Sequence, residues 1–181
     1  MDKTYLKRLV VGASVGAALL ASTSVIYGAD ETDVTRPALN CDNLQKRIEQ
    51  RIANYKNLRE KHQANYNRIA DRIRKLVTRF DEKGYDTAQL VADLKTLDEK
   101  IAKFASDADA AVKKLEEAND FVCGKSEGKF KSTLKEAKDL FDVARQSAKD
   151  VKDFLNTTIK DDLLALRNQK PSPTPVPTTS Q

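Results

Sequence analysis

A single apolar seam between Leu90 and Val122 constrains this chain more than any other feature. Small or apolar residues recur there in alternating steps of four and three, without a slip. That spacing is typical of one side of a long, coiled-coil-like helix. Because a narrow apolar seam is unfavourable in water, partner helices must cover it. The seam positions are Leu90, Leu94, Leu97, Ile101, Phe104, Ala108, Ala111, Leu115, Ala118 and Val122.

A similar seam lies before the central one and predicts a first helix over about residues 41–83. Gly84 follows its last turn and suits a left-handed C-cap. The central helix is then predicted over 86–122, where Asp86 and Gln89 have the spacing of a capping box. The first seam consists of Ile48, Ile52, Tyr55, Arg59, His62, Tyr66, Ile69, Ile73, Leu76 and Phe80.

A third seam predicts a helix over about residues 127–168. Its steps shift after Leu155, where residues 156–158 (Asn-Thr-Thr) are poor helix formers, so we expect its weakest point there. Short connections make neighbouring helices antiparallel. The predicted fold class is therefore all-α, an elongated up-down-up three-helix bundle over residues 41–169. A competing arrangement is a helical hairpin that forms oligomers through its third helix.

The segment 1–29 has the order of a secretory signal. Lys3, Lys7 and Arg8 precede the apolar run LVVGASVGAALLA, which small and polar residues follow. We expect export, with cleavage after residue 24, 28 or 29. The alternative is an uncleaved anchor, since about 20 uncharged residues can just span a bilayer. Either way, the protein is expected in the periplasm, at the cell surface or secreted.

Two further segments lie outside the predicted bundle. Residues 30–40 are polar and contain Pro37, which is typical of a linker. Residues 170–181 are rich in Pro, Thr and Ser, and such a tail stays extended because it cannot pack a core. The expected division is thus signal segment, linker, bundle and disordered tail.

The two cysteines, Cys41 and Cys123, lie at the predicted start of the first helix and the end of the second. Folding the hairpin at Gly84 brings them level at its open end. Exported proteins keep such pairs oxidised, so we predict a Cys41–Cys123 disulfide. The alternative is two buried free thiols. Two thiols without further ligands do not predict a metal site.

The sequence offers little for catalysis or cofactor binding. His62 is the only histidine and Met1 the only methionine, so neither a haem ligand pair nor a histidine-based catalytic group is indicated. The tripeptide at residues 124–126 imitates the end of a phosphate-binding loop but lacks the earlier glycine. We therefore expect no enzyme activity, no metal and no cofactor.

The middle of the first helix is unusually polar for a seam. Tyr55, Arg59, His62 and Tyr66 occupy positions where Ile and Leu serve elsewhere. One interpretation is a contact patch for a partner, since Tyr and Arg are favoured in recognition surfaces. The other, which we favour, is a buried polar layer that fixes helix register.

Charge is distributed unevenly along the chain. Residues 41–83 hold 12 basic and 6 acidic residues, residues 84–123 hold 5 and 9, and residues 124–181 hold 11 and 8. The favoured interpretation is an acidic helix that packs between two basic ones. The other is a basic groove for lipid, cell-wall polymer or nucleic acid, although the few aromatics argue against nucleic acid.

Two blocks, EKGYDTAQLVADLKTLDEKI and CGKSEGKFKSTLKEAKDLF, resemble segments of exported helical proteins of small-genome bacteria that carry no known activity. The resemblance spans Cys41 to about Asn168 and implies export and an all-helical fold. The layout is also similar to that of basic periplasmic holdase chaperones with helical tentacles, although no β-rich body segment matches.

The function that these features predict is that of a non-enzymatic exported or envelope protein, a structural spacer or protein-interaction module. Its expected partner is another envelope protein or polymer. One alternative is a periplasmic holdase that binds unfolded clients. A second is a binder of anionic envelope polymer or lipid through the basic first helix. Nucleic acid is not an expected partner, and membrane contact is expected only through an uncleaved N-terminal segment.

Overall fold

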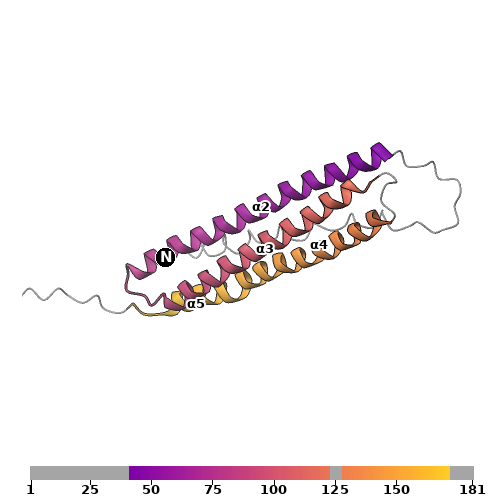
Figure 1. Ribbon diagram of the computed structural model, residues 1–181. Coiled ribbons are helices and arrows are strands. Elements are labelled where there is room, and N and C mark those ends of the chain that lie inside the picture. Colours follow the sequence, from indigo (N-terminus) through magenta and orange to yellow (C-terminus); the bar gives the residue numbers. More distant parts are fainter. Residues whose placement is uncertain (1–40, 123–127, 172–181) are drawn as a thin grey trace, which may run out of the picture.

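The computed structural model describes residues 41–122 and 128–171, and that part of the chain is all-helical. It forms an up-down-up three-helix bundle (Figure 1), which confirms the predicted fold class for these residues. The predicted signal segment, the linker and the tail from residue 172 lie outside the described residues. The elements are α2 (Cys41–Asp81), α3 (Ala88–Asp120), α4 (Lys129–Phe154), the π-helical turn η3 (Leu155–Ile159) and α5 (Lys160–Asn168).

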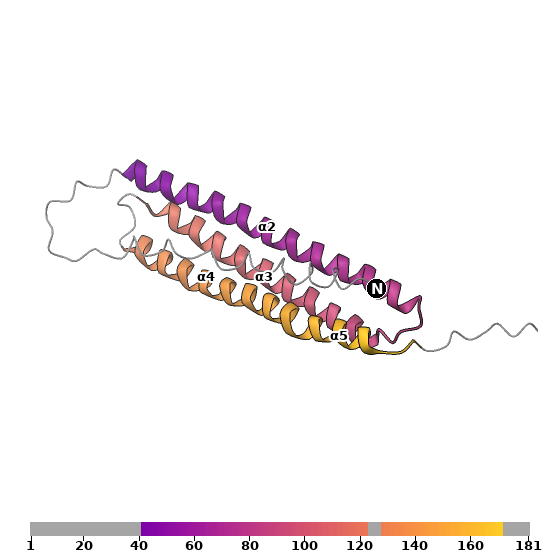
Figure 2. The same cartoon turned by 180° about the vertical axis from the view of Figure 1, so that it is seen from behind.

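The bundle is a rod in which α3 lies between α2 and the continuous α4–η3–α5 segment in both views (Figures 1 and 2). Its 41-residue helix α2 is about 60 Å long at 1.5 Å per residue. The start of α2, the end of α3 and the start of α4 lie at one end, and the connection between α2 and α3 lies at the other (Figure 1). Within the described residues, no helix combines the length and apolar character needed to cross a bilayer.

The turn between α2 and α3 is a Schellman motif centred on Gly84, which has φ 76°. The Tyr85 amide donates to the Phe80 carbonyl at 3.1 Å, and the Gly84 amide donates to the Asp81 carbonyl at 2.9 Å. The rings of Phe80 and Tyr85 pack edge to face, 5.2 Å between centroids. This apolar contact completes the motif and confirms the predicted left-handed C-cap.

The predicted capping box at the start of α3 is wrong. Thr87 is the N-cap residue, and its side chain makes no capping hydrogen bond. Gln89 donates to Asp93 at 2.6 Å instead of reaching back toward the cap. The Asp86 carboxylate accepts from the Ala88 amide at 3.1 Å, so a local Asx turn already satisfies that amide.

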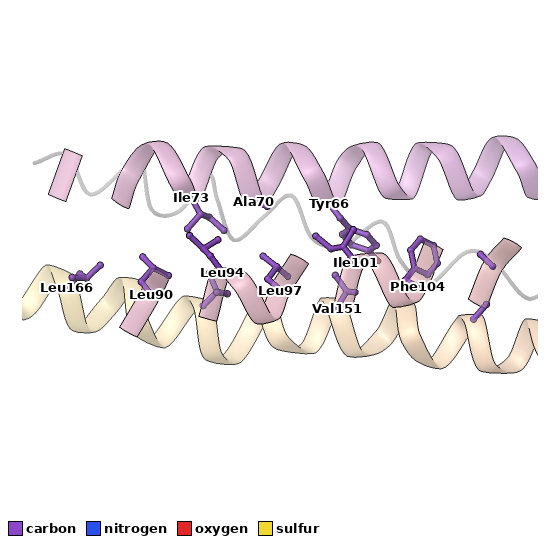
Figure 3. Close-up of a cluster of buried hydrophobic side chains, with 13 residues drawn as sticks. Tyr66, Ala70, Ile73, Leu90, Leu94, Leu97, Ile101, Phe104, Val151 and Leu166 are labelled. Atoms are coloured by element: carbon purple, nitrogen blue, oxygen red, sulfur yellow. The ribbon is translucent and has the colours of Figure 1, made fainter. Parts of the chain in front are cut away.

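The core follows the central seam. Every predicted position of the central seam is buried except Val122, which follows α3 and is half-buried. Figure 3 shows Ile73 and Tyr66 of α2 pointing toward this seam from one side and Val151 of α4 from the other. Because α3 is covered on two sides, its apolar stripe is wider than predicted and also includes Ala105 and Val112.

The two partner helices pack against α3 at different backbone distances. The backbones of α3 and α4 approach closely over most of their length, those of α2 and α3 less, and those of α2 and α4 scarcely at all. Small residues explain the difference, because they let helix axes come close. The buried residues of α4 are Thr133, Ala137, Ala144, Ser147 and Val151, whereas those of α2 include Ile48, Tyr66 and Ile73.

The predicted weak point of the third helix is a π-helical turn over Leu155–Ile159. A π turn holds one residue more than an α turn, so it rotates the residues that follow. Val151, Ile159 and Leu166 are thereby all buried, although their spacing breaks the four-and-three rule. The extra residue is thus the structural cause of the shift seen in the sequence.

Candidate functional site

Three of the four predicted patch residues point between the helices. Tyr55 packs its ring on Phe141 of α4, with centroids 4.2 Å apart. Tyr66 is 8% exposed and donates its hydroxyl to the Ala148 carbonyl of α4 at 3.4 Å. These two tyrosines therefore bridge α2 and α4 where the backbones do not meet.

His62 lies in an aromatic cluster at mid-bundle. Its ring centroid is 6.1 Å from that of Tyr66 and 6.2 Å from that of Phe104, which packs edge to face on Tyr66 at 5.7 Å. Burial lowers the pKa of His62 below its usual value and raises that of Tyr66. Both groups therefore favour their neutral forms, which suits a packed layer.

Arg59 joins α2 to α3. Its Nη1 lies 2.7 Å from the Asp109 carboxylate, and its side chain is 23% exposed. Its Nε is buried and makes no hydrogen bond within the described part of the chain. The four patch residues thus do not converge on one open cavity. Contact with a partner at this patch stays a prediction.

A second polar contact, between α3 and α4, was not foreseen from the sequence. The Ser147 hydroxyl of α4 donates to the Asp107 carboxylate of α3, which also accepts from Lys103 at 2.8 Å. Although burial opposes ionisation, these two hydrogen bonds lower the pKa of Asp107. The only feature of the sequence that could have indicated this contact is the position of Asp107 and Asp109 on either side of the seam residue Ala108.

The structure also brings together an acid pair that the sequence did not reveal. Asp162 of α5 lies beside Asp93 of α3, and its buried Oδ2 has no hydrogen-bond partner among the residues that the structure describes. Burial and the neighbouring carboxyl of Asp93 raise the pKa of Asp162 to about 6, and Asp161 adds further repulsion. Two carboxylates alone do not make a metal site, and no group of three or more possible metal-ligating residues occurs among the residues described.

The cations of α2 separate into two sets. Lys56, Arg59 and Arg74 pair with carboxylates of α3. Lys56 lies 2.6 Å from Glu116, Arg59 2.7 Å from Asp109 and Arg74 2.6 Å from Asp98. Helix pairing between opposite charges, as predicted, accounts for this set.

The second set is a row along one side of α2 that we call the α2 row. At 3.6 residues per turn its eight members fall within about 140° of one another, and no acidic residue of α2 shares that arc. None forms an ion pair within the described residues, and Arg68 donates only to the neutral Asn65. The α2 row is Lys46, Arg47, Arg51, Lys61, Arg68, Arg72, Lys75 and Arg79.

The structure has a shallow hollow of about 420 Å³ between α2 and α3, near the end that carries Cys41. The Lys56–Glu116 ion pair lines it, as does Asn119, whose buried Oδ1 finds no hydrogen-bond partner in the described part of the chain. The hollow is open, and three carboxylates and one lysine line it. It therefore lacks the enclosed, mostly apolar lining that is typical of a small-molecule site.

Cys41 is the first residue of α2, and Cys123 lies outside the described residues. Leu44 and Val122, close neighbours of these cysteines in the sequence, pack against the same apolar cluster. The two chain segments that lead to the cysteines are therefore close, and the Cys41–Cys123 disulfide stays a prediction. Comparison with protein family models, curated proteins and solved structures finds no match to this chain.

Proposed function

We propose that this protein is a non-enzymatic, exported helical rod that serves as a spacer or interaction module in the cell envelope. The observation that carries the proposal is the bundle itself, three long helices side by side, with α2 exposing most of its length. Such a rod separates what is attached at its ends and offers long faces to a partner.

The internal polar groups support a structural role. Arg59 is held by Asp109, Asp107 by Ser147, and Tyr66 by the Ala148 carbonyl. Each of these contacts ties one helix to another. A general acid or base would instead have to reach a bound substrate.

Export rests on the sequence. The segment 1–29 has the order of a secretory signal, and a Pro/Thr/Ser-rich tail follows the bundle, as in many exported spacers. The resemblance to exported helical proteins of small-genome bacteria agrees with this location.

The proposal is tested by cell fractionation followed by cross-linking mass spectrometry in the native host. We expect the protein in the envelope or culture fraction, with cross-links from exposed lysines of the helix faces to a reproducible partner. Recovery in the cytoplasm with residues 1–29 intact would contradict export.

A second assay separates the spacer from the chaperone alternative. The purified protein is added to an unfolded outer-membrane protein, and aggregation is followed by light scattering. A spacer leaves aggregation unchanged, as does a matched amount of an unrelated helical protein. Suppression at equimolar amounts would favour the holdase instead.

A further inference from the structure

The α2 row has a counterpart on α4. Six cations of α4 fall within about 100° of one another at 3.6 residues per turn. Arg145 pairs with Asp142 at 2.8 Å, whereas Lys131, Lys135 and Lys149 form no ion pair within the described part. This α4 row consists of Lys131, Lys135, Lys138, Arg145, Lys149 and Lys152.

The two rows lie on the same face of the bundle. On α2, Lys56 and Arg74 mark the side that faces α3, and the α2 row lies on the other side of the seam. On α4, Glu136 and Ser147 mark the side that faces α3, because they contact Lys114 and Asp107, and the α4 row again lies opposite.

Direct contacts between α2 and α4 join the rows into one surface. The Tyr55 ring packs on Phe141, and the Tyr66 hydroxyl reaches the Ala148 carbonyl, so side chains rather than backbones join α2 to α4 along this face. The acidic helix α3 lies behind it and neutralises only the cations that point its way. Two carboxylates also lie within the arc of the α4 row, Asp142, which pairs with Arg145, and Asp153. The fourteen cations of the two rows outnumber them, so the face keeps a positive charge, which repels itself unless an anion binds.

The shape of this cationic face indicates the kind of anion. From Lys46 to Arg79 the α2 row runs about 50 Å along the rod at 1.5 Å per residue. Charges spread over such a length match an extended polymer with regularly spaced charges better than a small ligand.

Two other polyanionic partners fit less well. Insertion into a membrane surface needs exposed bulky apolar side chains beside the cations, but the exposed ones described are Val91 on α3 and Val143, off the α4 row. Stacking on bases needs exposed aromatic rings, whereas Tyr55, Tyr66 and Phe141 pack between the helices.

We propose that the cationic face of α2 and α4 binds a linear anionic polymer without bases, one that carries phosphate or carboxylate groups along its length. This inference rests on the proposed function as an interaction module, and it specifies the chemical class of the partner that the module binds. The lysines and arginines contact the charges of the polymer backbone. Gln50, Asn54 and Asn57, which fall within the arc of the α2 row, donate hydrogen bonds to its oxygens.

The test is binding of fluorescently labelled inorganic polyphosphate to the purified protein at several salt concentrations. We expect an affinity that falls steeply with salt. Arg72→Gln/Lys75→Gln in the α2 row and Lys135→Gln/Lys149→Gln in the α4 row are each expected to weaken binding at least about tenfold at 0.1 M salt and to flatten the salt dependence.

The matched control is Lys95→Gln/Lys113→Gln, which removes two exposed lysines of α3, neither in an ion pair among the described residues. We expect it to bind within about twofold of the unmodified protein, because single charges outside the face contribute little. Equal loss in the control and the row variants would overturn the proposal, as would no loss in either row variant. Circular dichroism confirms that all variants stay folded.

Two competing probes decide the class of partner. Vesicles of phosphatidylglycerol and phosphatidylcholine test a membrane surface, and single-stranded DNA of equal charge tests stacking on bases. Tighter binding to either than to polyphosphate would overturn the proposal. If no probe binds while cross-linking still finds a protein partner in the envelope, this inference falls and the proposed function stands.

Discussion

Asp162 shows most clearly how packing changes a single residue. On an exposed helix the pKa of its carboxyl would be about 4, but partial burial and the neighbouring Asp93 raise it to about 6. A raised carboxyl pKa contributes stability that is fully present below about pH 4, and that contribution is lost as the pH rises through 6. Near neutral pH the pair therefore repels and weakens the attachment of α5 to α3.

We accordingly expect Asp162→Asn to stabilise the protein at pH 7.5. The gain should be about 1 kcal/mol, since partial exposure screens the repulsion, and it should shrink toward zero at pH 4.5. Urea unfolding at the two pH values measures it. Asp153→Asn, which removes an exposed carboxylate of α4, serves as the control. It should change the free energy of unfolding only slightly, and by the same amount at the two pH values. A gain that does not depend on pH would contradict the assignment.

His62 acts in the opposite direction. Burial lowers its pKa, so the stability it contributes is present above its usual pKa near 6.5 and is lost as the pH falls below it. We expect His62→Phe to gain stability relative to the unmodified protein as the pH is lowered from 7.5 to 5. Thermal melting across this range measures the difference, and a constant difference would argue against a neutral, packed His62.

At the scale of the element, α3 is the helix on which the others depend. Leu97 is fully buried in its seam, so Leu97→Asp places an unpaired charge in the core. We expect a loss of more than about 4 kcal/mol and of the cooperative melting transition. Ala102→Asp, at an exposed position of the same helix, should stay within about 0.5 kcal/mol. Unchanged melting of Leu97→Asp would contradict this register.

The π-helical turn predicts how the third helix responds to the deletion of one residue. Removing one residue there lets an ordinary α-helix continue, and Ile159, Leu163 and Leu166 move into the four-and-three spacing that begins at Val151. Deletion of Thr157 should therefore keep the fold, with stability within about 1 kcal/mol of the unmodified protein or above it. Circular dichroism checks that the fold is kept, and urea unfolding measures the stability.

A deletion elsewhere in the same helix supplies the comparison. Asp139 is exposed within the regular part of α4, and its removal turns every later seam residue by about 100° away from the core. That variant should lose the cooperative transition. If deletion of Thr157 is as damaging as deletion of Asp139, the π turn is not the device that restores register.

For the whole molecule, the open end of the α2–α3 hairpin is the place where a covalent link contributes most. A Cys41–Cys123 disulfide would close a long loop and stabilise the fold by about 4 to 5 kcal/mol in the chain-entropy model. We expect non-reducing peptide mapping of the oxidised protein to find this pair. Free thiols in that preparation would contradict the disulfide. If the disulfide exists, Cys41→Ser should lower the urea midpoint of the oxidised protein, and if it does not, the midpoint should stay the same.

Local patterns predicted the helices, their order, the Gly84 turn and the position of the register break, because periodicity and backbone conformation are local properties. They also identified Tyr55, Arg59, His62 and Tyr66 as a polar interruption of the α2 seam. An apolar seam says which side of a helix is buried, but it does not say how two partner helices are placed around a third.

Which charges meet depends on how the helices pack against one another. Small residues draw α4 close to α3, while aromatic residues hold α2 farther away, and this unequal packing sets the rotation of each helix. That rotation turns Lys56 and Arg74 toward carboxylates of α3 and leaves the α2 row without a partner among the described residues. It also brings Asp93 and Asp162 together across a long stretch of chain, which no local pattern could reveal because their contact depends on three-dimensional packing.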